Sequence, residues 1–224
     1  AEPQLFCAAV PAVITFLIAS KIDAPASWDK KMNDKVLCHG YQFFKNHWGQ
    51  SEYKYIVEFP QRMLHDFPNS MTFGQFKACI NLDLCHMSGT WRCVINYQKT
   101  QLSSALECCF QQGFNRLVVE LNHQFYAVLK RNNFYYIFDP YRHKIDGGVP
   151  SSKSASLRMF RNLGKMLQIF NLMLLYQNKS SDFCLYSMDF LRVYQSDCPP
   201  CEGDMDEDVK SLNAYIWFRE NLTD

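Results

Sequence analysis

The sequence lacks a basic cluster, because its 224 residues contain 23 Lys and Arg against 22 Asp and Glu, a formal net charge of +1. No run of Lys and Arg is long enough to form a phosphate-binding surface, so nucleic acid is not an expected partner. Internal repeats and low-complexity tracts are also missing, while 48% of the residues are hydrophobic. A chain of this length and composition can bury a sizeable core, and we expect one domain with an appendage.

A membrane anchor is not expected either. The one long apolar run, from Leu5 to Ile22, is not preceded by a basic segment and contains Pro11. It is also short for a membrane span, so a buried helix is the better interpretation. We expect Pro11 to lie close to the start of that helix, where a missing N–H costs little.

A disulfide framework is not indicated by the ten cysteines, which are scattered along the chain. Several lie within apolar patterns, where a reduced thiol packs as a small hydrophobic group. The sequence therefore predicts a reducing compartment and an intracellular protein, cytoplasmic or nuclear.

The most informative segment runs from His123 to Asp139. It is rich in aromatic and aliphatic residues, interrupted only by residues 130–133, which end in Asn132 and Asn133. Asparagine tolerates the positive φ of a tight turn, so the segment predicts a β-hairpin. We expect His123 to open its first strand and Asp139 to close its second, which would bring an imidazole and a carboxylate together.

The remaining patterns predict an α+β fold with a mostly antiparallel sheet. A helix from about Trp28 to Trp48 has Ser27 as a candidate N-cap, and Gly113 is suited to end a helix. The expected helices span about residues 7–20, 28–48, 101–109, 162–176 and 209–221, and the expected strands span 116–122, 156–160 and 183–194. Residues 52–98 look strand-like but are broken by prolines and glycines.

Cys7 is the candidate nucleophile, because it lies where the first helix should begin. Unpaired N–H groups and the dipole at a helix start favour the thiolate form of a cysteine. The chain order Cys7, His123, Asp139 is that of papain-type enzymes, in which the imidazole acts as base and the acidic residue orients it. Gln4, three residues before Cys7, is the candidate partner of the Cys7 amide in an oxyanion hole.

Two alternatives compete for the cysteines. Cys184 follows the histidine and the aspartate in sequence, as in proteases of another branch, but Leu185 stands where those enzymes have glycine. A zinc site using Cys198 and Cys201 with a second pair such as Cys108 and Cys109 falls short of a finger or ribbon spacing. No metal and no cofactor are predicted.

Four stretches together resemble the deubiquitinase domain of herpesvirus large tegument proteins and related papain-fold domains. They are Gln4 to Ala9, Trp28 to Phe44, Phe134 to Arg142, and the glycine-containing loop followed by Ser154 to Tyr194. The resemblance covers about residues 4–195. It implies a papain-like cysteine protease fold and a ubiquitin-directed or ubiquitin-like-directed isopeptidase, with ubiquitin or a related modifier as partner.

One position departs from that family. Its enzymes have aspartate, proline and then the catalytic histidine, whereas this chain has Asp139, Pro140 and Tyr141. A phenol with a pKa near 10 cannot replace imidazole as a base near neutral pH. Either His123 supplies the imidazole, with His143 pointing elsewhere, or the domain is a catalytically inactive interaction module.

The end of the chain has a different composition. We predict a papain-fold domain over residues 1–195, an acidic linker over 196–208 and a C-terminal helix over 209–224. The helix carries aromatic residues, and we expect it either to dock on the domain or to bind a protein partner.

Overall fold

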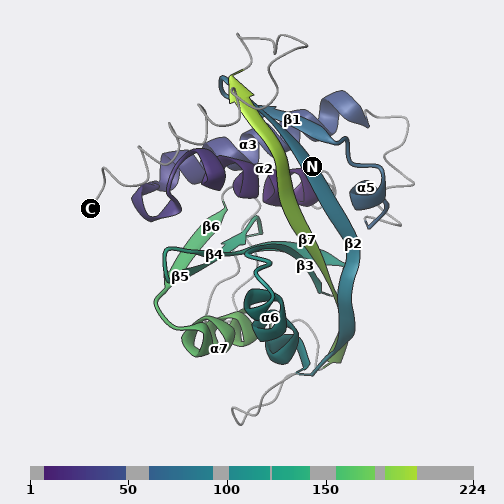
Figure 1. Cartoon of the computed structure of the whole chain (residues 1–224), viewed down its shortest axis with the longest axis vertical. Helices are drawn as coiled ribbons and strands as arrows, with labels where there is room; N and C mark the ends of the chain where they lie inside the picture. Colours follow the sequence, from purple (N-terminus) through teal and green to yellow (C-terminus); the bar gives the residue numbers. More distant parts are fainter. Residues whose placement is uncertain are drawn as a thin grey trace.

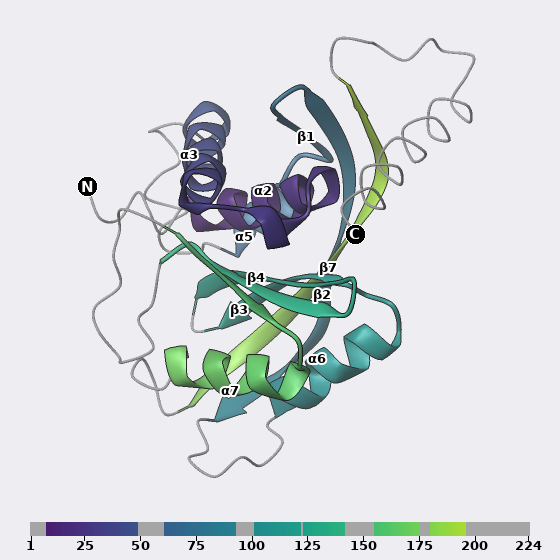
Figure 2. The same ribbon diagram turned by 90° about the vertical axis from the view of Figure 1, so that its left-hand side faces the viewer.

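The computed structural model of the chain describes residues 8–48, 61–92, 101–121, 123–141, 155–174 and 180–195. A seven-stranded antiparallel sheet separates two pairs of helices, with α2 and α3 over one face and α6 and α7 over the other (Figures 1 and 2). The helical elements are α2 (Ala9–Ile22), η1 (Pro25–Ser27), α3 (Lys30–His47), α5 (Arg62–His65), α6 (Gln101–Gln111) and α7 (Leu163–Leu174). The α+β class predicted from the sequence is confirmed.

The sheet has the spatial order β1-β2-β7-β3-β4-β5-β6. The strands are β1 (Ser70–Phe73), β2 (Phe76–Arg92), β3 (Arg116–Leu121), β4 (Gln124–Arg131), β5 (Phe134–Asp139), β6 (Ser156–Phe160) and β7 (Ser180–Gln195). The long strands β2 and β7 pair along most of their length and cross the whole molecule in Figure 1. Two strands that are far apart in sequence therefore form the part of the sheet that extends past both helix pairs.

The hairpin expected between His123 and Asp139 is present as β4 and β5. Its turn residues Asn132 and Asn133 have φ values of 48° and 61°. Two successive residues with positive φ form the type of turn that matches the twist of paired strands. The register, in which Ala127 faces Phe138, follows from this turn.

Helix α2 is buried on all sides, because every residue from Ala9 to Ser20 is inaccessible to solvent or nearly so. Pro11 is the third helical residue, as expected from its missing N–H. The run from Leu5 is thus a core helix over its described part, and no helix within the described ranges is long and apolar enough to cross a membrane.

Helix α3 begins later than the sequence predicted. Asp29, and not Ser27, is its N-cap, and the Asp29 carboxylate accepts a hydrogen bond of 2.8 Å from the Met32 N–H. Ser27 ends the short 3-10 turn η1, where its hydroxyl donates to the Ala24 carbonyl. Serine and aspartate are both good N-caps, so the sequence did not distinguish them, and the helix was predicted to begin two residues too early.

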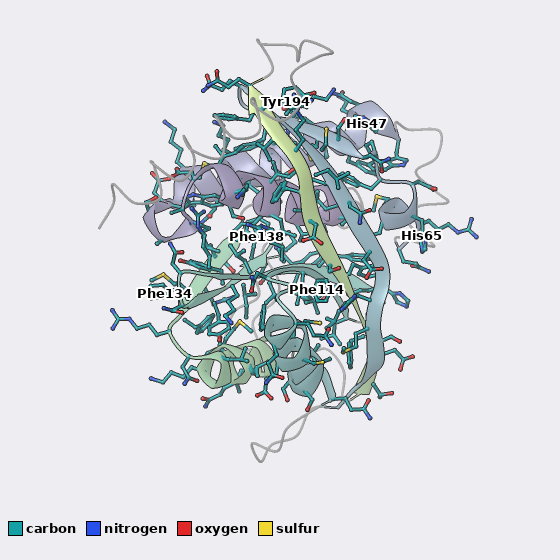
Figure 3. All side chains as sticks on the ribbon, viewed as in Figure 1. His47, His65, Phe114, Phe134, Phe138 and Tyr194 are labelled. Carbon is teal, nitrogen blue, oxygen red and sulfur yellow. The ribbon has the colours of Figure 1, made fainter. Side chains whose placement is uncertain are left out.

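Two hydrophobic clusters lie on opposite faces of the sheet. The first joins α2 and α3 to inward-facing residues such as Val118, Phe125 and Phe138, and Phe16 stacks on Phe138 with ring centroids 4.9 Å apart. Figure 3 shows Phe138 between α2 and the sheet. The second cluster joins α6 and α7 to Val119, Val128 and their neighbours on the other face.

Candidate active site

Helix α2 and strand β4 run in the same direction across the sheet. At one end, Arg131 at the end of β4 donates a hydrogen bond to the Ser20 carbonyl near the end of α2. At the other end, Ala9, the first residue of α2, packs in the same cluster as Tyr126 and Tyr141. Between these ends, Phe16 of α2 stacks on Phe138, the register partner of Ala127 on β4, so the start of α2 lies toward the corner where β4 begins and β5 ends.

The predicted nucleophile lies next to the start of α2 in the sequence. Cys7 is two residues before Ala9 and Gln4 is five residues before it, and both lie outside the described residues. Ala8, the N-cap of α2, makes no side-chain cap hydrogen bond. The first N–H groups of a helix have no partner within the helix itself, and they favour an anion at this end. The assignment of Cys7 as nucleophile and of Gln4 to the oxyanion hole stays a prediction.

Asp139 closes β5 and is completely buried. Its Oδ1 accepts a hydrogen bond of 2.9 Å from the Tyr141 N–H, and its Oδ2 lies 4.0 Å from Nη1 of Arg158 on β6. Burial lowers the pKa of Arg158, and the Asp139 charge opposes that shift. These contacts supply the compensation that a buried carboxylate needs.

Tyr141 fills the corner at the position where the related enzymes have histidine. Its side chain is buried, and its hydroxyl oxygen accepts a hydrogen bond of 3.2 Å from the Phe125 N–H. Its ring meets Tyr126 edge to face at 5.8 Å, and the Tyr126 hydroxyl donates to Gln124 Oε1 at 2.7 Å. The phenol is thus built into the packing of the corner.

His123 lies immediately before β4, in the turn that follows β3, and not within the strand as predicted. Its φ of 58° is left-handed, and its side chain is 75% exposed. The ring Nδ1 lies 3.8 Å from Oε1 of Glu120 on β3. The structure thus places His123 at the same end of the sheet as Asp139 but in contact with a different carboxylate.

The other candidate residues fall into two groups. Cys184 is a half-buried residue of β7 opposite Glu120, so it lacks the helix start that would favour a thiolate. His143, Cys198 and Cys201 lie outside the described residues. Within the part of the chain that the structure describes, no group of three or more His, Cys, Asp and Glu could hold a metal ion.

Sequence reasoning missed Glu120 and Tyr186. Glu120 lies in the mostly apolar strand β3, and its Oε2 accepts a hydrogen bond of 2.5 Å from the Tyr186 hydroxyl of β7. A single acidic residue within an apolar strand is a signal that sequence alone provides. Its partner on β7 is 66 residues away, and no local pattern identifies it.

A family model described as the N-terminal conserved region of the herpesvirus tegument protein matches residues 2–193. Among solved structures, the chain is similar to the ubiquitin-specific protease encoded by murine cytomegalovirus tegument protein M48, in complex with a ubiquitin-based suicide substrate. The TM-score is 0.58 at 11% identity, over 99% of this chain and 88% of that one. No curated protein matches the chain. The papain-like protease fold implied by the resemblance is confirmed.

Proposed function

This chain belongs to the family of the herpesvirus tegument protein N-terminal region, and we propose that it is a cysteine isopeptidase domain directed at ubiquitin or a ubiquitin-like modifier. Cys7 is the nucleophile, His123 the base, and Gln4 with the Cys7 amide the oxyanion hole. Asp139 is the carboxylate that the sequence predicts for holding the imidazole. One observation carries the proposal: α2 begins at the corner where β4 starts beside His123 and β5 ends at Asp139.

The proposed reaction cleaves an isopeptide bond in two steps, through a thioester on Cys7. His123 accepts the thiol proton of Cys7, and the thiolate attacks the carbonyl carbon of the isopeptide bond. The negative charge on the carbonyl oxygen is stabilised by N–H donors at the start of α2 and by Gln4. His123 then protonates the leaving lysine amine, and water, deprotonated by the same imidazole, hydrolyses the thioester and restores the Cys7 thiol.

A ubiquitin derivative with a C-terminal propargylamide tests this mechanism. We expect one covalent adduct on Cys7, measured by intact mass and peptide mapping, with none on Cys7→Ala. His123→Ala should lower the labelling rate by about 10²–10⁴, the usual contribution of a base. His65→Ala is the matched control, because His65 is an exposed histidine on α5, labelled in Figure 3. A folded wild-type chain that forms no adduct would refute the enzyme.

Tyr141 supports a second candidate, a non-catalytic domain that binds the modifier without cleaving it. The phenol is buried, its hydroxyl is bonded to the Phe125 N–H, and its N–H is bonded to Asp139. In this candidate the fold retains the binding surface, while the histidine that would act beside Asp139 has been replaced.

The substitution Tyr141→His separates the two candidates. If the domain only binds, the wild type should bind ubiquitin in isothermal titration without forming an adduct, and Tyr141→His should gain labelling that disappears in Cys7→Ala. Tyr141→Phe is the control, since it changes the same site without adding an imidazole. Labelling of the wild type that depends on His123 would instead favour the enzyme.

The proposal extends to the organisation of the chain. Residues 1–195 form the protease-fold domain, residues 196–208 a linker and residues 209–224 a helix that binds a protein partner, in an intracellular setting. The family match over residues 2–193 supports the first boundary. Removal of residues 196–224 should leave ubiquitin labelling intact and abolish binding of the other partner, measured by comparing pull-downs of the full and shortened chains.

A further inference from the structure

Glu120 is an acidic residue in a mostly buried strand. Its side chain is only 14% exposed, and its neighbours on both sides in β3 are buried apolar residues. A carboxylate in such a place is costly unless hydrogen bonds or charges compensate it. The contacts of Glu120 therefore indicate what keeps the charge there.

Tyr186 fixes one oxygen of this carboxylate. Its hydroxyl donates to Glu120 Oε2 at 2.5 Å, and its ring is 4% exposed. Burial, followed by this hydrogen bond, raises the pKa of Tyr186 far above its usual range, so the phenol remains a donor. Because Val118 and Tyr186 are register partners on the paired strands β3 and β7, the contact spans two central strands of the sheet.

His123 faces the other oxygen. The backbone turn after β3 brings its Nδ1 to 3.8 Å from Glu120 Oε1, within the range of an ion pair and longer than a hydrogen bond. An ionised carboxylate can only accept, so a hydrogen bond between these two atoms would require the proton on Nδ1 of the imidazole. Nε2 then carries the free electron pair that a general base requires.

Asp139 lies in a different environment. Phe138, the residue before it, pairs with Ala127 on β4, so the register continued by one residue puts Asp139 opposite Tyr126, about 10 Å along the strand from His123. Alternation along β5 puts Asp139 on the same face as Ile137, over α6 and α7, whereas Glu120 shares the α2 face with Val118. The Asp139 carboxylate instead contacts Arg158 and the Tyr141 N–H.

We propose that Glu120, held by Tyr186, is the carboxylate that positions the His123 imidazole, in place of Asp139. Glu120 and Tyr186 are thus positioning residues, and they act on the reaction only through His123. The inference rests on the proposed function for its catalytic consequence, but the contact itself does not depend on activity.

The imidazole form of His123 tests the contact directly. In the full chain, two-dimensional ¹H–¹⁵N spectra at a pH where the ring is neutral should show the proton of His123 on Nδ1, assigned by loss of the signal in His123→Ala. Glu120→Gln and Tyr186→Phe should shift the population toward Nε2–H, and Asp139→Asn should not. A wild-type ring protonated on Nε2, or one that responds to Asp139→Asn but not to Glu120→Gln, would overturn the inference.

The labelling rate with ubiquitin propargylamide tests the consequence. Glu120→Gln should lower the rate of Cys7 labelling by about tenfold, less than the loss of the base itself. Tyr186→Phe should lower it in the same direction, and Asp66→Asn, which changes an exposed carboxylate on the α5 side, should not. Thermal melting of each variant checks that the chain is folded, and Tyr186→Phe provides the test if Glu120→Gln does not fold.

The two proposals fail in different ways. If the imidazole form follows Glu120 but the wild type forms no adduct, the proposed enzyme is wrong and the positioning contact stands. If labelling requires Cys7 and His123 but neither the ring nor the rate responds to Glu120→Gln and Tyr186→Phe, the enzyme stands and the inference is wrong.

Discussion

The hydroxyl of Tyr141, just after β5, makes a hydrogen bond to the start of β4. It accepts the Phe125 N–H, and both residues are buried. Tyr141→Phe would leave that buried N–H without its partner, which costs about 1–3 kcal/mol. We expect the free energy of unfolding, measured by urea titration, to fall by this amount.

Tyr135→Phe is the matched control for this substitution. Tyr135 is a half-buried residue of the same strand, and its hydroxyl makes no hydrogen bond within the described part of the chain. Its loss should change the stability by less than about 0.5 kcal/mol, as for a substitution away from such contacts. Equal effects of the two variants would mean that the Tyr141 hydroxyl does not stabilise the corner.

The cysteines differ in reactivity because their surroundings differ. Cys109 on α6 is fully buried, and burial first, then the neighbouring Cys108, raises its pKa to about 11. Cys38 on α3 is exposed. At pH 8, iodoacetamide should therefore modify Cys38 and spare Cys109, as measured by peptide mass spectrometry, and both should react in urea.

The raised pKa of Cys109 should also make the free energy of unfolding fall at alkaline pH. The pKa of Cys109 is higher in the folded chain than its ordinary value of 9.0, so the unfolded chain loses this proton first as pH rises. The stabilising contribution is complete below pH 9.0 and is lost as pH approaches about 11. Cys109→Ser should weaken this alkaline loss in urea titrations, whereas Cys38→Ser should leave it unchanged.

Helices α2 and α3 cross at a point where only glycine fits. A Cβ on Gly40 would lie 2.5 Å from the backbone N and Cα of Ala12, and backbone atoms in a buried helix cannot give way easily. Gly40→Ala gains up to about 1 kcal/mol of helix propensity. The clash should outweigh this gain and give a net loss of about 1–3 kcal/mol, as in overpacked cores.

Thermal and urea unfolding would measure the effect of Gly40→Ala. Gly164→Ala on α7 is the control, because its Cβ would meet only the tip of the Asn162 side chain, at 3.0 Å. The oxygen at that tip caps α7 by accepting a hydrogen bond of 3.1 Å from the Lys165 N–H, so the control weakens at most one cap, a cost of about 1 kcal/mol that the gain in helix propensity offsets. A stabilised Gly40→Ala would show that the two helices can separate without loss of packing.

Turns and helix ends could be predicted from the sequence where the backbone preference of one or two residues determines them. Asn132 and Asn133 identified the hairpin turn because asparagine tolerates positive φ, and Gly113, with φ of 90°, ends α6 as expected. His123 was assigned to a strand because the apolar pattern begins beside it. Histidine is also enriched at positive φ, and this competing preference decided its position in the turn.

At the scale of the whole molecule, the pairing of β2 with β7 was not predictable. It joins Phe76 to Gln195, more than 100 residues apart, through a ribbon with two register shifts. Hydrophobic alternation indicates that each segment is a strand, but it does not specify which strand is its partner. The contact between Glu120 and His123 depends on the turn after β3, and its support by Tyr186 depends on β7, so sequence patterns identified the histidine but not the carboxylate beside it.

The shared sheet should make the two helix pairs unfold together. The first cluster contains Leu17 on α2 and the second Leu106 on α6, and both side chains are completely buried. Neighbouring residues of β3, Val118 and Val119, belong to different clusters, so neither cluster can open without disturbing the same strands. Leu17→Ala and Leu106→Ala should each cost about 2–5 kcal/mol and shift one common transition.

Far-ultraviolet circular dichroism and tryptophan fluorescence would follow that transition with urea. Trp28 packs edge to face on Phe16 at 5.4 Å, and Trp48 belongs to the same cluster. With Trp91 and Trp217 replaced by Phe in every chain tested, the fluorescence reports the α2 side, whereas circular dichroism averages over both helix pairs. Coincident midpoints in the wild type and in both variants are expected. A Leu106→Ala variant whose circular dichroism changes before its fluorescence would show that α6 and α7 unfold separately, so that the protease-like corner between α2 and β4 could persist without them.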